Sequence, residues 1–195
     1  MQVISTPGFV IGAGLAALLL AAASPARAEK FTTQLSGLNE IGALGAGETG
    51  AIRTAGTGTL ELDLNEKAQT LTYTLSFAGL SSDVTQAHIH FGKARVAGGI
   101  MVFFCSNLAN PPAGTPACPA AGGTVSGTIT PASVIGPTAQ NVSPGDFAAL
   151  ADAITTRTSY ANVHTAKFPA GEIRGQIHRA PDKDHDNNDR GDHRH

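Results

Sequence analysis

The sequence predicts an all-β fold: a Greek-key β-sandwich or barrel of about eight antiparallel strands with one short helix. Three observations predict it. Short blocks alternate apolar and polar residues, the pattern of a strand with one buried face. Turns rich in Gly, Pro and Ser separate these blocks. The 195 residues include 23 Gly and only 14% charged residues, a composition that favours short strands over long helices.

The clearest strands form a hairpin. The block 57–64 (TGTLELDL) places its leucines on one face, and the block 70–77 (TLTYTLSF) repeats the alternation. Five turn residues, NEKAQ, join the two blocks, so we expect a hairpin with one buried face. Six further strands are expected at residues 31–36, 84–91, 100–105, 123–129, 159–165 and 172–178.

One helix of about ten residues is expected between the last strands. Ser143 can cap its start, Pro144 suits the first turn, and Asp146 stands three residues after the cap as the acid of a capping box. The apolar residues that then share one helical face are Phe147, Leu150 and Ile154. We expect this face to pack on the sandwich.

Both ends of the chain lie outside the expected domain, which spans residues 29–180. Residues 9–23 are apolar and uncharged, and Ala26 and Ala28 form an A-x-A site, so residues 1–28 are predicted to be a signal peptide cleaved before Glu29. Since no Lys or Arg precedes Phe9, an uncleaved membrane anchor is the alternative. Export predicts a periplasmic or secreted protein with no permanent membrane span after cleavage.

The tail 181–195 (PDKDHDNNDRGDHRH) has no apolar side chain beyond its first proline, so we expect it to be disordered. Its histidines, His185, His193 and His195, can bind transition metals loosely, but a solvated tail is the simpler interpretation.

Cys105 and Cys118 are the only cysteines, and they flank a turn-forming loop, SNLANPPAGTPA. In an oxidising compartment such a pair predicts a disulfide. Metal thiolates are the alternative, but no second cysteine pair exists to support them.

The charge balance excludes two classes of partner. The chain has 13 Lys and Arg against 15 Asp and Glu, a net charge of −2. Nucleic-acid binding needs a clustered basic surface, and attraction to acidic polymers or membrane surfaces needs positive charge. The sequence also lacks a nucleophile elbow, a phosphate-binding glycine loop and an HExxH motif. We therefore expect no nucleic-acid partner and no catalytic residue.

Three histidines are candidate metal ligands. Strand alternation places His88 and His90 together on the face opposite Ala87 and Ile89, and it places His164 on the same face of a second strand. We expect this face to point toward water. Three imidazoles suit copper or zinc; the alternative is that each ring hydrogen-bonds a loop carbonyl or Glu172 and fixes the end of the sheet.

Other polar residues belong to the same face. These candidates are Asn162, Glu172 and Arg174. Glu172 and Arg174 stand two residues apart, so a surface ion pair is the simplest interpretation, ahead of a catalytic acid.

Five segments together resemble the CHRD (chordin-type) domain over about residues 31–178: FTTQLSGLNE, AGTGTLELDL, LTYTLSFAGL, AHIHFG and YANVHTAKFPAGEIRGQI. The match departs from the usual pattern after Glu40, and the loop between the cysteines looks like a local elaboration. In animals such domains are repeated in secreted chordin, which antagonises bone morphogenetic proteins. Bacterial relatives are usually single-domain exported proteins, the type that this chain resembles.

The resemblance indicates the fold more than the activity, and we expect an exported, non-enzymatic module whose histidine face binds a protein, a cell-surface partner or a metal. A second similarity gives the alternative: AHIHFG is similar to the HxHxFG strand of copper-zinc superoxide dismutases, which are also Greek-key sandwiches, so His88 and His90 would match the copper pair. The other dismutase ligands have no matching motif here. The fold expectation is therefore superoxide-dismutase-like or immunoglobulin-like, and the alternative function is binding of copper or zinc by three histidines.

Overall fold

The computed structural model describes residues 28–42 and 50–181. The expected signal peptide and tail, apart from Ala28 and Pro181, lie outside the described residues, so both stay predictions. Among the described residues, no helix is long and apolar enough to cross a membrane.

The described residues form nine strands and one α-helix, which confirms the predicted all-β fold. The strands are β1 Glu29–Ser36, β2 Thr57–Asn65, β3 Thr70–Ala78, β4 Val84–Phe91, β5 Gly99–Ser106, β6 Gly123–Ile129, β7 Ser159–Thr165, β8 Ile173–Gln176 and β9 His178–Arg179, and the helix is α1 Phe147–Thr155. Short 3-10 turns lie at Gly37–Asn39, Pro131–Ser133 and Thr138–Gln140.

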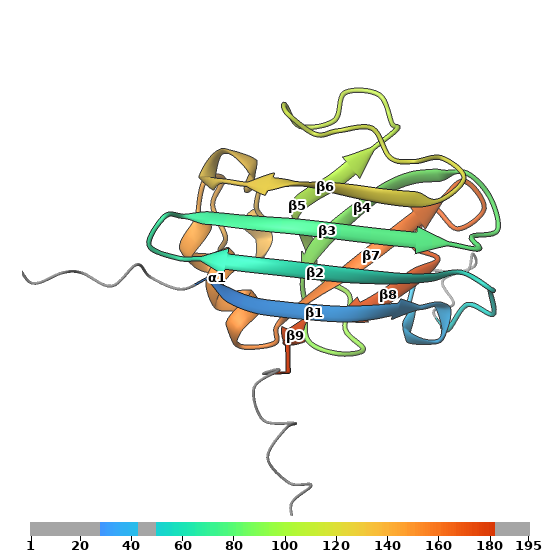
Figure 1. The fold of residues 1–195 in the computed structure, drawn as a ribbon, viewed down its shortest axis with the longest axis horizontal. Coiled ribbons are helices and arrows are strands. Elements are labelled where there is room, and N and C mark those ends of the chain that lie inside the picture. Colours follow the sequence, from blue (N-terminus) through green and yellow to red (C-terminus); the bar gives the residue numbers. More distant parts are fainter. Residues whose placement is uncertain (1–27, 43–49, 182–195) are drawn as a thin grey trace, which may run out of the picture.

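The strands follow the order β5-β4-β7-β8-β1-β2-β3-β6, and β9 pairs with β1. All pairings are antiparallel. After β4, β5 and β6 the chain returns in β7 to pair with β4, and β5 lies close to β6, which makes the topology a Greek key. Figure 1 shows the two layers: β1, β2, β3 and β6 lie in front, and β4, β5, β7 and β8 cross behind them.

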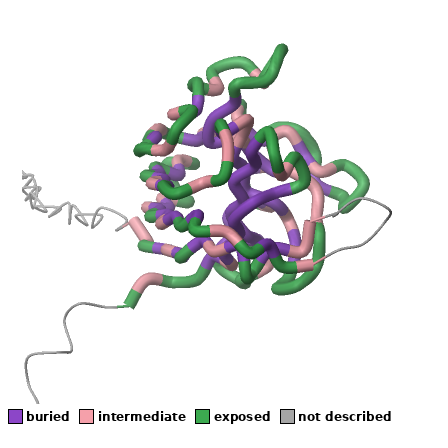
Figure 2. The backbone as a smooth tube through the Cα atoms, turned by 90° about the vertical axis from the view of Figure 1, so that its right-hand side faces the viewer, coloured by how far each residue is buried: buried purple, intermediate pink, exposed green. Residues whose placement is uncertain are grey.

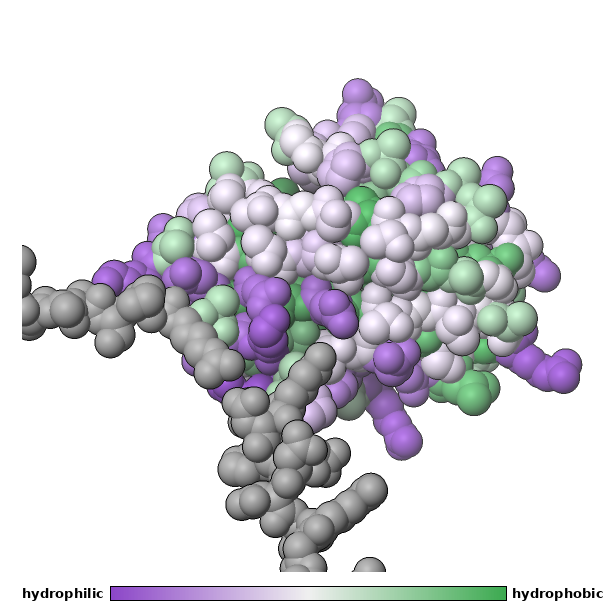
Figure 3. Space-filling view, viewed as in Figure 1, coloured by the Kyte–Doolittle hydropathy of each residue, from purple (hydrophilic) through white to green (hydrophobic). Residues whose placement is uncertain are grey.

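The core lies between these layers, where Figure 2 shows buried residues in purple. The hairpin alternation predicted for residues 57–77 is correct: Leu60, Leu71 and Leu75 are fully buried and meet Ile89 and Val163 of the opposite layer in one apolar cluster. The outer face of the front layer carries mainly Thr and Ser, which gives much of it the pale colours of intermediate hydropathy in Figure 3.

Helix α1 packs at one end of the layers (left in Figure 1), with the predicted face of Phe147, Leu150 and Ile154 buried. Its start differs from the prediction. The N-cap is Asp146, whose carboxylate accepts a hydrogen bond from the Ala149 N–H, and not Ser143. The reason is Gly145, which has a φ of 86° and turns the chain out of the helical conformation just before Asp146.

β5 and β6 are the two end strands of the sheet, and they form no backbone ladder with each other. They nevertheless lie close in space, so that the sheet is nearly closed into a barrel. We call these two facing edges the β5–β6 seam. The Tyr73 hydroxyl from β3 donates a hydrogen bond of 2.7 Å to the Phe104 carbonyl of β5. Gly127 of β6 is the cross-strand partner of Tyr73, and a Cβ there would come within 2.9 Å of the Tyr73 hydroxyl.

The predicted cysteine pair spans the same region. The sulfur atoms of Cys105, in β5, and Cys118, in the loop before β6, lie at disulfide distance, and both residues are buried. The Asn107 side chain also accepts a hydrogen bond from the Cys118 N–H and donates one to the Cys118 carbonyl. The loop is thus fixed to the end of β5 both covalently and by hydrogen bonds.

Candidate metal centre

The structure brings the three predicted histidines together. β4 pairs with β7, and the register places Gln86 opposite His164 and His88 opposite Asn162. His88 and His164 are therefore diagonal neighbours, and His90 lies two residues along the same strand. Each ring offers one nitrogen to a group whose ligand atoms all lie within 4.8 Å of one another.

The expectation that this face points toward water is wrong. His88 is 0%, His90 8% and His164 6% exposed, although Ala87 and Ile89 face the main core as predicted. The reason is that loops cover the outer side of β4 and β7, and strand alternation carries no information about loops that fold back over a sheet.

Two glycines let these loops approach. A Cβ at Gly98, in the β4–β5 loop, would overlap the Phe91 carbonyl, so only glycine fits where the loop folds back on β4. Gly171, in the β7–β8 loop, has a φ of 128°, and a Cβ there would lie 2.6 Å from the Asn162 amide nitrogen. Both loops provide carbonyl groups that contact the histidines.

These carbonyls fix the protons of two rings. His164 Nδ1 lies 2.9 Å from the Pro169 carbonyl, and His90 Nδ1 lies 3.0 Å from the Gly98 carbonyl. A carbonyl only accepts hydrogen bonds, so each Nδ1 carries the proton and each Nε2 keeps a lone pair in the neutral ring. The Nε2 atom of His90 is buried and has no hydrogen-bond partner in the described part of the chain.

His88 contacts His164 on one side and Gln86 on the other. Its Nδ1 lies 3.1 Å from His164 Nε2, and its Nε2 lies 3.1 Å from the Gln86 side-chain oxygen. In one proton arrangement His88 Nε2 donates to Gln86, and the lone pairs of His88 Nδ1 and His164 Nε2 then face each other. In the other, His88 Nδ1 donates to His164, and the Gln86 amide turns its NH₂ group toward His88. The first arrangement leaves one nitrogen of each ring with a free lone pair, as metal binding by all three rings requires.

Burial keeps the rings uncharged. It lowers the pKa of His88 to about 2, with the neighbouring His164 and His90 adding to the shift. It lowers the pKa of His90 to about 4, although the hydrogen bond to the Gly98 carbonyl opposes this. Burial also lowers the pKa of His164. Neutral imidazole is the form that binds a metal.

A second layer of side chains surrounds the rings. The Tyr160 ring stacks on His90 with a centroid distance of 4.8 Å. The Arg174 guanidinium in turn lies 3.3 Å from the centroid of the Tyr160 ring. Arg174 donates hydrogen bonds to the Lys93 and Val96 carbonyls of that loop. The edge of the Phe103 ring packs against His88.

Asn162 and Glu40 form a further contact of this layer. The Asn162 amide donates to the Glu40 carboxyl and to the Ile173 carbonyl. Glu40 is buried, and burial raises its pKa, although hydrogen bonds and the charge of Arg174 oppose the shift. Sequence reasoning missed Glu40; its one signal is that it closes the motif FTTQLSGLNE.

Glu172 and Arg174 do not form the predicted surface ion pair. Both are buried, at 0% and 3% exposed, and the Glu172 carboxylate instead accepts four hydrogen bonds, from the Thr54 and Thr165 hydroxyls and from the backbone and side chain of Ser81. The alternation argument fails here because β8 begins at Ile173, so Glu172 lies in the turn that precedes the strand.

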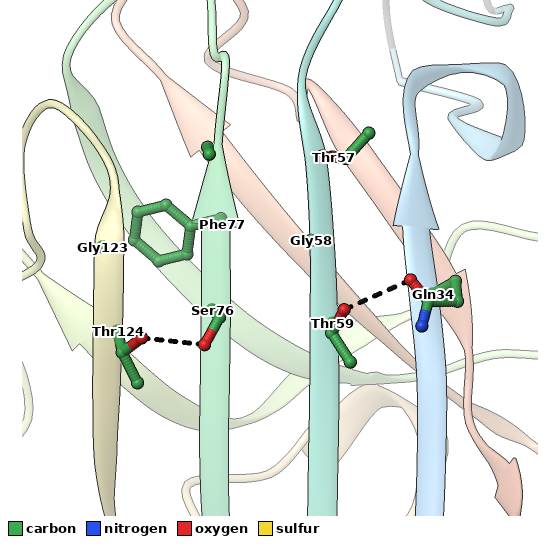
Figure 4. Close-up of a pocket in the computed structure, with 9 residues that line it drawn as sticks. Gln34, Thr57, Gly58, Thr59, Ser76, Phe77, Gly123 and Thr124 are labelled. Atoms are coloured by element: carbon green, nitrogen blue, oxygen red, sulfur yellow. Dashed lines mark hydrogen bonds between the residues drawn. The ribbon is translucent and has the colours of Figure 1, made fainter.

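A shallow groove lies elsewhere, on the outer face of β1, β2, β3 and β6 (Figure 4). Its polar side chains satisfy one another: Thr59 donates to Gln34, and Ser76 and Thr124 share a hydrogen bond. The groove contains no charged or imidazole group. The histidine cluster is therefore the stronger candidate site.

The buried cysteine pair at disulfide distance is consistent with a module of the extracellular type, since disulfides persist in oxidising compartments. A family model described as the CHRD domain matches residues 31–177. The chain belongs to the CHRD domain family, which confirms the resemblance found in the sequence. Comparison with curated proteins and with solved structures gave no match.

Proposed function

We propose that the protein is an exported, non-enzymatic binding module with a protein or cell-surface partner. The observation that carries the proposal is the CHRD domain over residues 31–177, following a leader-like apolar segment. The buried pair Cys105–Cys118 supports it, since a disulfide persists in an oxidising compartment. Because His88, His90 and His164 are buried, the partner would contact a surface other than the histidine face that the sequence led us to expect.

Cell fractionation and intact-mass analysis test this proposal. We expect the full-length gene product in the periplasm or medium, with Glu29 as its first residue and no free thiol. Photo-cross-linking on intact cells should then give a discrete adduct with a protein or envelope component. Reduced protein that stays in the cytoplasm with residues 1–28 attached would contradict export.

A second candidate function is binding of copper or zinc by His88, His90 and His164. The observation that favours it is that one nitrogen of each buried ring lies within 4.8 Å of the others, while the opposite ring nitrogen contacts an oxygen atom. Metal-bound histidines are typically oriented by such contacts. Metal–nitrogen bonds of about 2.0–2.1 Å place ligand atoms roughly 3.3–3.6 Å apart, so a pair at the 4.8 Å limit of this group would have to contract by about 1.2–1.5 Å on binding.

Calorimetric titration of the full chain with Zn²⁺ and, separately, Cu²⁺ tests this candidate. We expect one equivalent of metal to bind to a variant in which His185, His193 and His195 are replaced by Gln, because these tail residues could bind metal by themselves. That equivalent should be lost on adding His90→Gln and kept with His178→Gln, a matched change at an exposed histidine. Equal binding by both variants would contradict the candidate.

A further inference from the structure

Resting on the metal-binding candidate above, we infer that the three-histidine pocket prefers a monovalent cation, Cu(I), over Zn²⁺ and Cu²⁺. The preference follows from the charge of the pocket and from the number of ligands it offers. Imidazole binds both zinc and copper, so the ligand type alone does not separate these ions.

The ligands contribute no negative charge. Among the described residues, the group that could hold an ion at this place consists of three histidines, with no carboxylate or thiolate. Zinc sites with three protein ligands complete their tetrahedron with a fourth ligand, and Cu(II) favours a square-planar or tetragonal arrangement. Cu(I) has a filled d shell and is stable with three nitrogen donors.

The side chains around the three histidines include one cation and one acid. Arg174 is held in place by the Lys93 and Val96 carbonyls and by its stacking on Tyr160, which itself stacks on His90. Glu40 is the acid of this layer, and it is held by the Asn162 amide and by the Ile41 N–H. The pocket is therefore bordered by one fixed cation and one carboxyl group.

Burial makes the charge of the ion decisive. The most exposed of the three histidines is 8% accessible, so a bound ion would lose most of its contact with water. The cost of moving an ion out of water rises with the square of its charge, about fourfold from a monocation to a dication. The three ligands are neutral and the charges of Arg174 and Glu40 oppose each other, so the pocket offers no net negative charge to offset this cost, and the monovalent ion is favoured.

Competition titrations under anaerobic conditions test the preference. Cu(I) is titrated into the full chain carrying the three tail substitutions, in the presence of bicinchoninate, and Zn²⁺ is titrated against a zinc indicator. We expect one equivalent of Cu(I), bound at least 100-fold more tightly than Zn²⁺. Ag(I), which has the same charge and a filled d shell but is redox-inert, should compete for the same site.

His90→Gln should abolish this Cu(I) binding, and His178→Gln should not. His90 is chosen because it lies outside the His88–His164 hydrogen bond and its Nε2 has no partner among the described residues; circular dichroism checks that loss of its Nδ1 contact with the Gly98 carbonyl leaves the fold intact. Zn²⁺ binding that is as tight as Cu(I) binding would overturn the preference and leave metal binding standing. Absence of any His90-dependent equivalent would overturn both.

Three variants test whether the charge around the pocket, and not only the arrangement of its ligands, sets the preference for Cu(I). Arg174→Gln removes the cation, and we expect it to reduce the Cu(I)-over-Zn²⁺ preference by about tenfold; Arg174→Lys keeps the charge and should preserve the preference. Glu40→Gln removes the acid and should increase the preference. Equal changes in the affinities for both metals in all three variants would show that the charge does not set the selectivity.

Discussion

Glu172 shows how one buried charge can hold separate segments of the chain. Its carboxylate has no cationic partner among the described residues. Instead it accepts hydrogen bonds from Thr54 before β2, from Ser81 between β3 and β4, and from Thr165 at the end of β7. Burial alone would raise the pKa of this carboxyl, but the four hydrogen bonds outweigh burial and lower it.

The lowered pKa predicts a pH-dependent contribution to stability. Above the ordinary value of 4.5, the carboxyl is ionised in both the folded and the unfolded state, so its contribution is complete. As the pH falls below that value, the unfolded state takes up a proton first, and the contribution is lost. We expect Glu172→Gln to reduce the free energy of unfolding by about 2–4 kcal/mol at neutral pH and by clearly less near pH 3.

Urea denaturation at both pH values measures this difference, with Glu61→Gln on the exposed face of β2 as the control. Equal losses at the two pH values would show that Glu172 contributes through the shape of its side chain and not through its charge.

At the scale of elements, β5 and β6 have no backbone ladder between them, and the Tyr73 side chain provides a hydrogen bond across the β5–β6 seam instead. Tyr73 crosses from β3, over Gly127 of β6, to the carbonyl of Phe104. The glycine has a steric purpose here, since a larger residue would occupy the position of the tyrosine ring.

Tyr73→Phe should destabilise the protein by about 1–3 kcal/mol, because it leaves the Phe104 carbonyl without its donor. Gly127→Ala should destabilise it by displacing the same ring. Because both changes act on one contact, the double variant should lose less stability than the two single losses added together. Thermal unfolding of the four proteins measures this coupling, Thr128→Ala provides the neighbouring exposed control, and strict additivity would contradict the proposed role of Gly127.

The strands and the helix could be predicted from the sequence more accurately than the loops that cover them. Alternation located the eight main strands because each has one face in the core, as Leu60 and Ile89 illustrate. The start of α1 was misplaced because the conformation of Gly145, which is not encoded in helix periodicity, decides it. The same limit applies to the site: alternation placed His88, His90 and His164 on one face, but the loops containing Gly98 and Pro169 decide that this face is buried.

At the scale of the whole molecule, the cysteine pair and the tyrosine contact act at the same place. Cys105 and Cys118 are 13 residues apart, and closing a loop of this size stabilises a protein by about 3 kcal/mol in the chain-entropy model. Replacing both cysteines with alanine should cost about that much in chemical denaturation, and a reducing agent should lower the stability of the wild type but not of the variant.

The effect of reduction should also be local before it is global. β5 has β4 as its single ladder partner, and β6 has only β3, so these edge strands are held together by the disulfide loop and by Tyr73. Native-state hydrogen exchange should therefore show faster exchange in β5 and β6 on reduction, with β2 unchanged, since β2 is paired on both sides. Tyr73→Phe should enlarge the same effect. A uniform increase over all strands would mean that the barrel opens only by complete unfolding, and that the β5–β6 seam is not its weakest boundary.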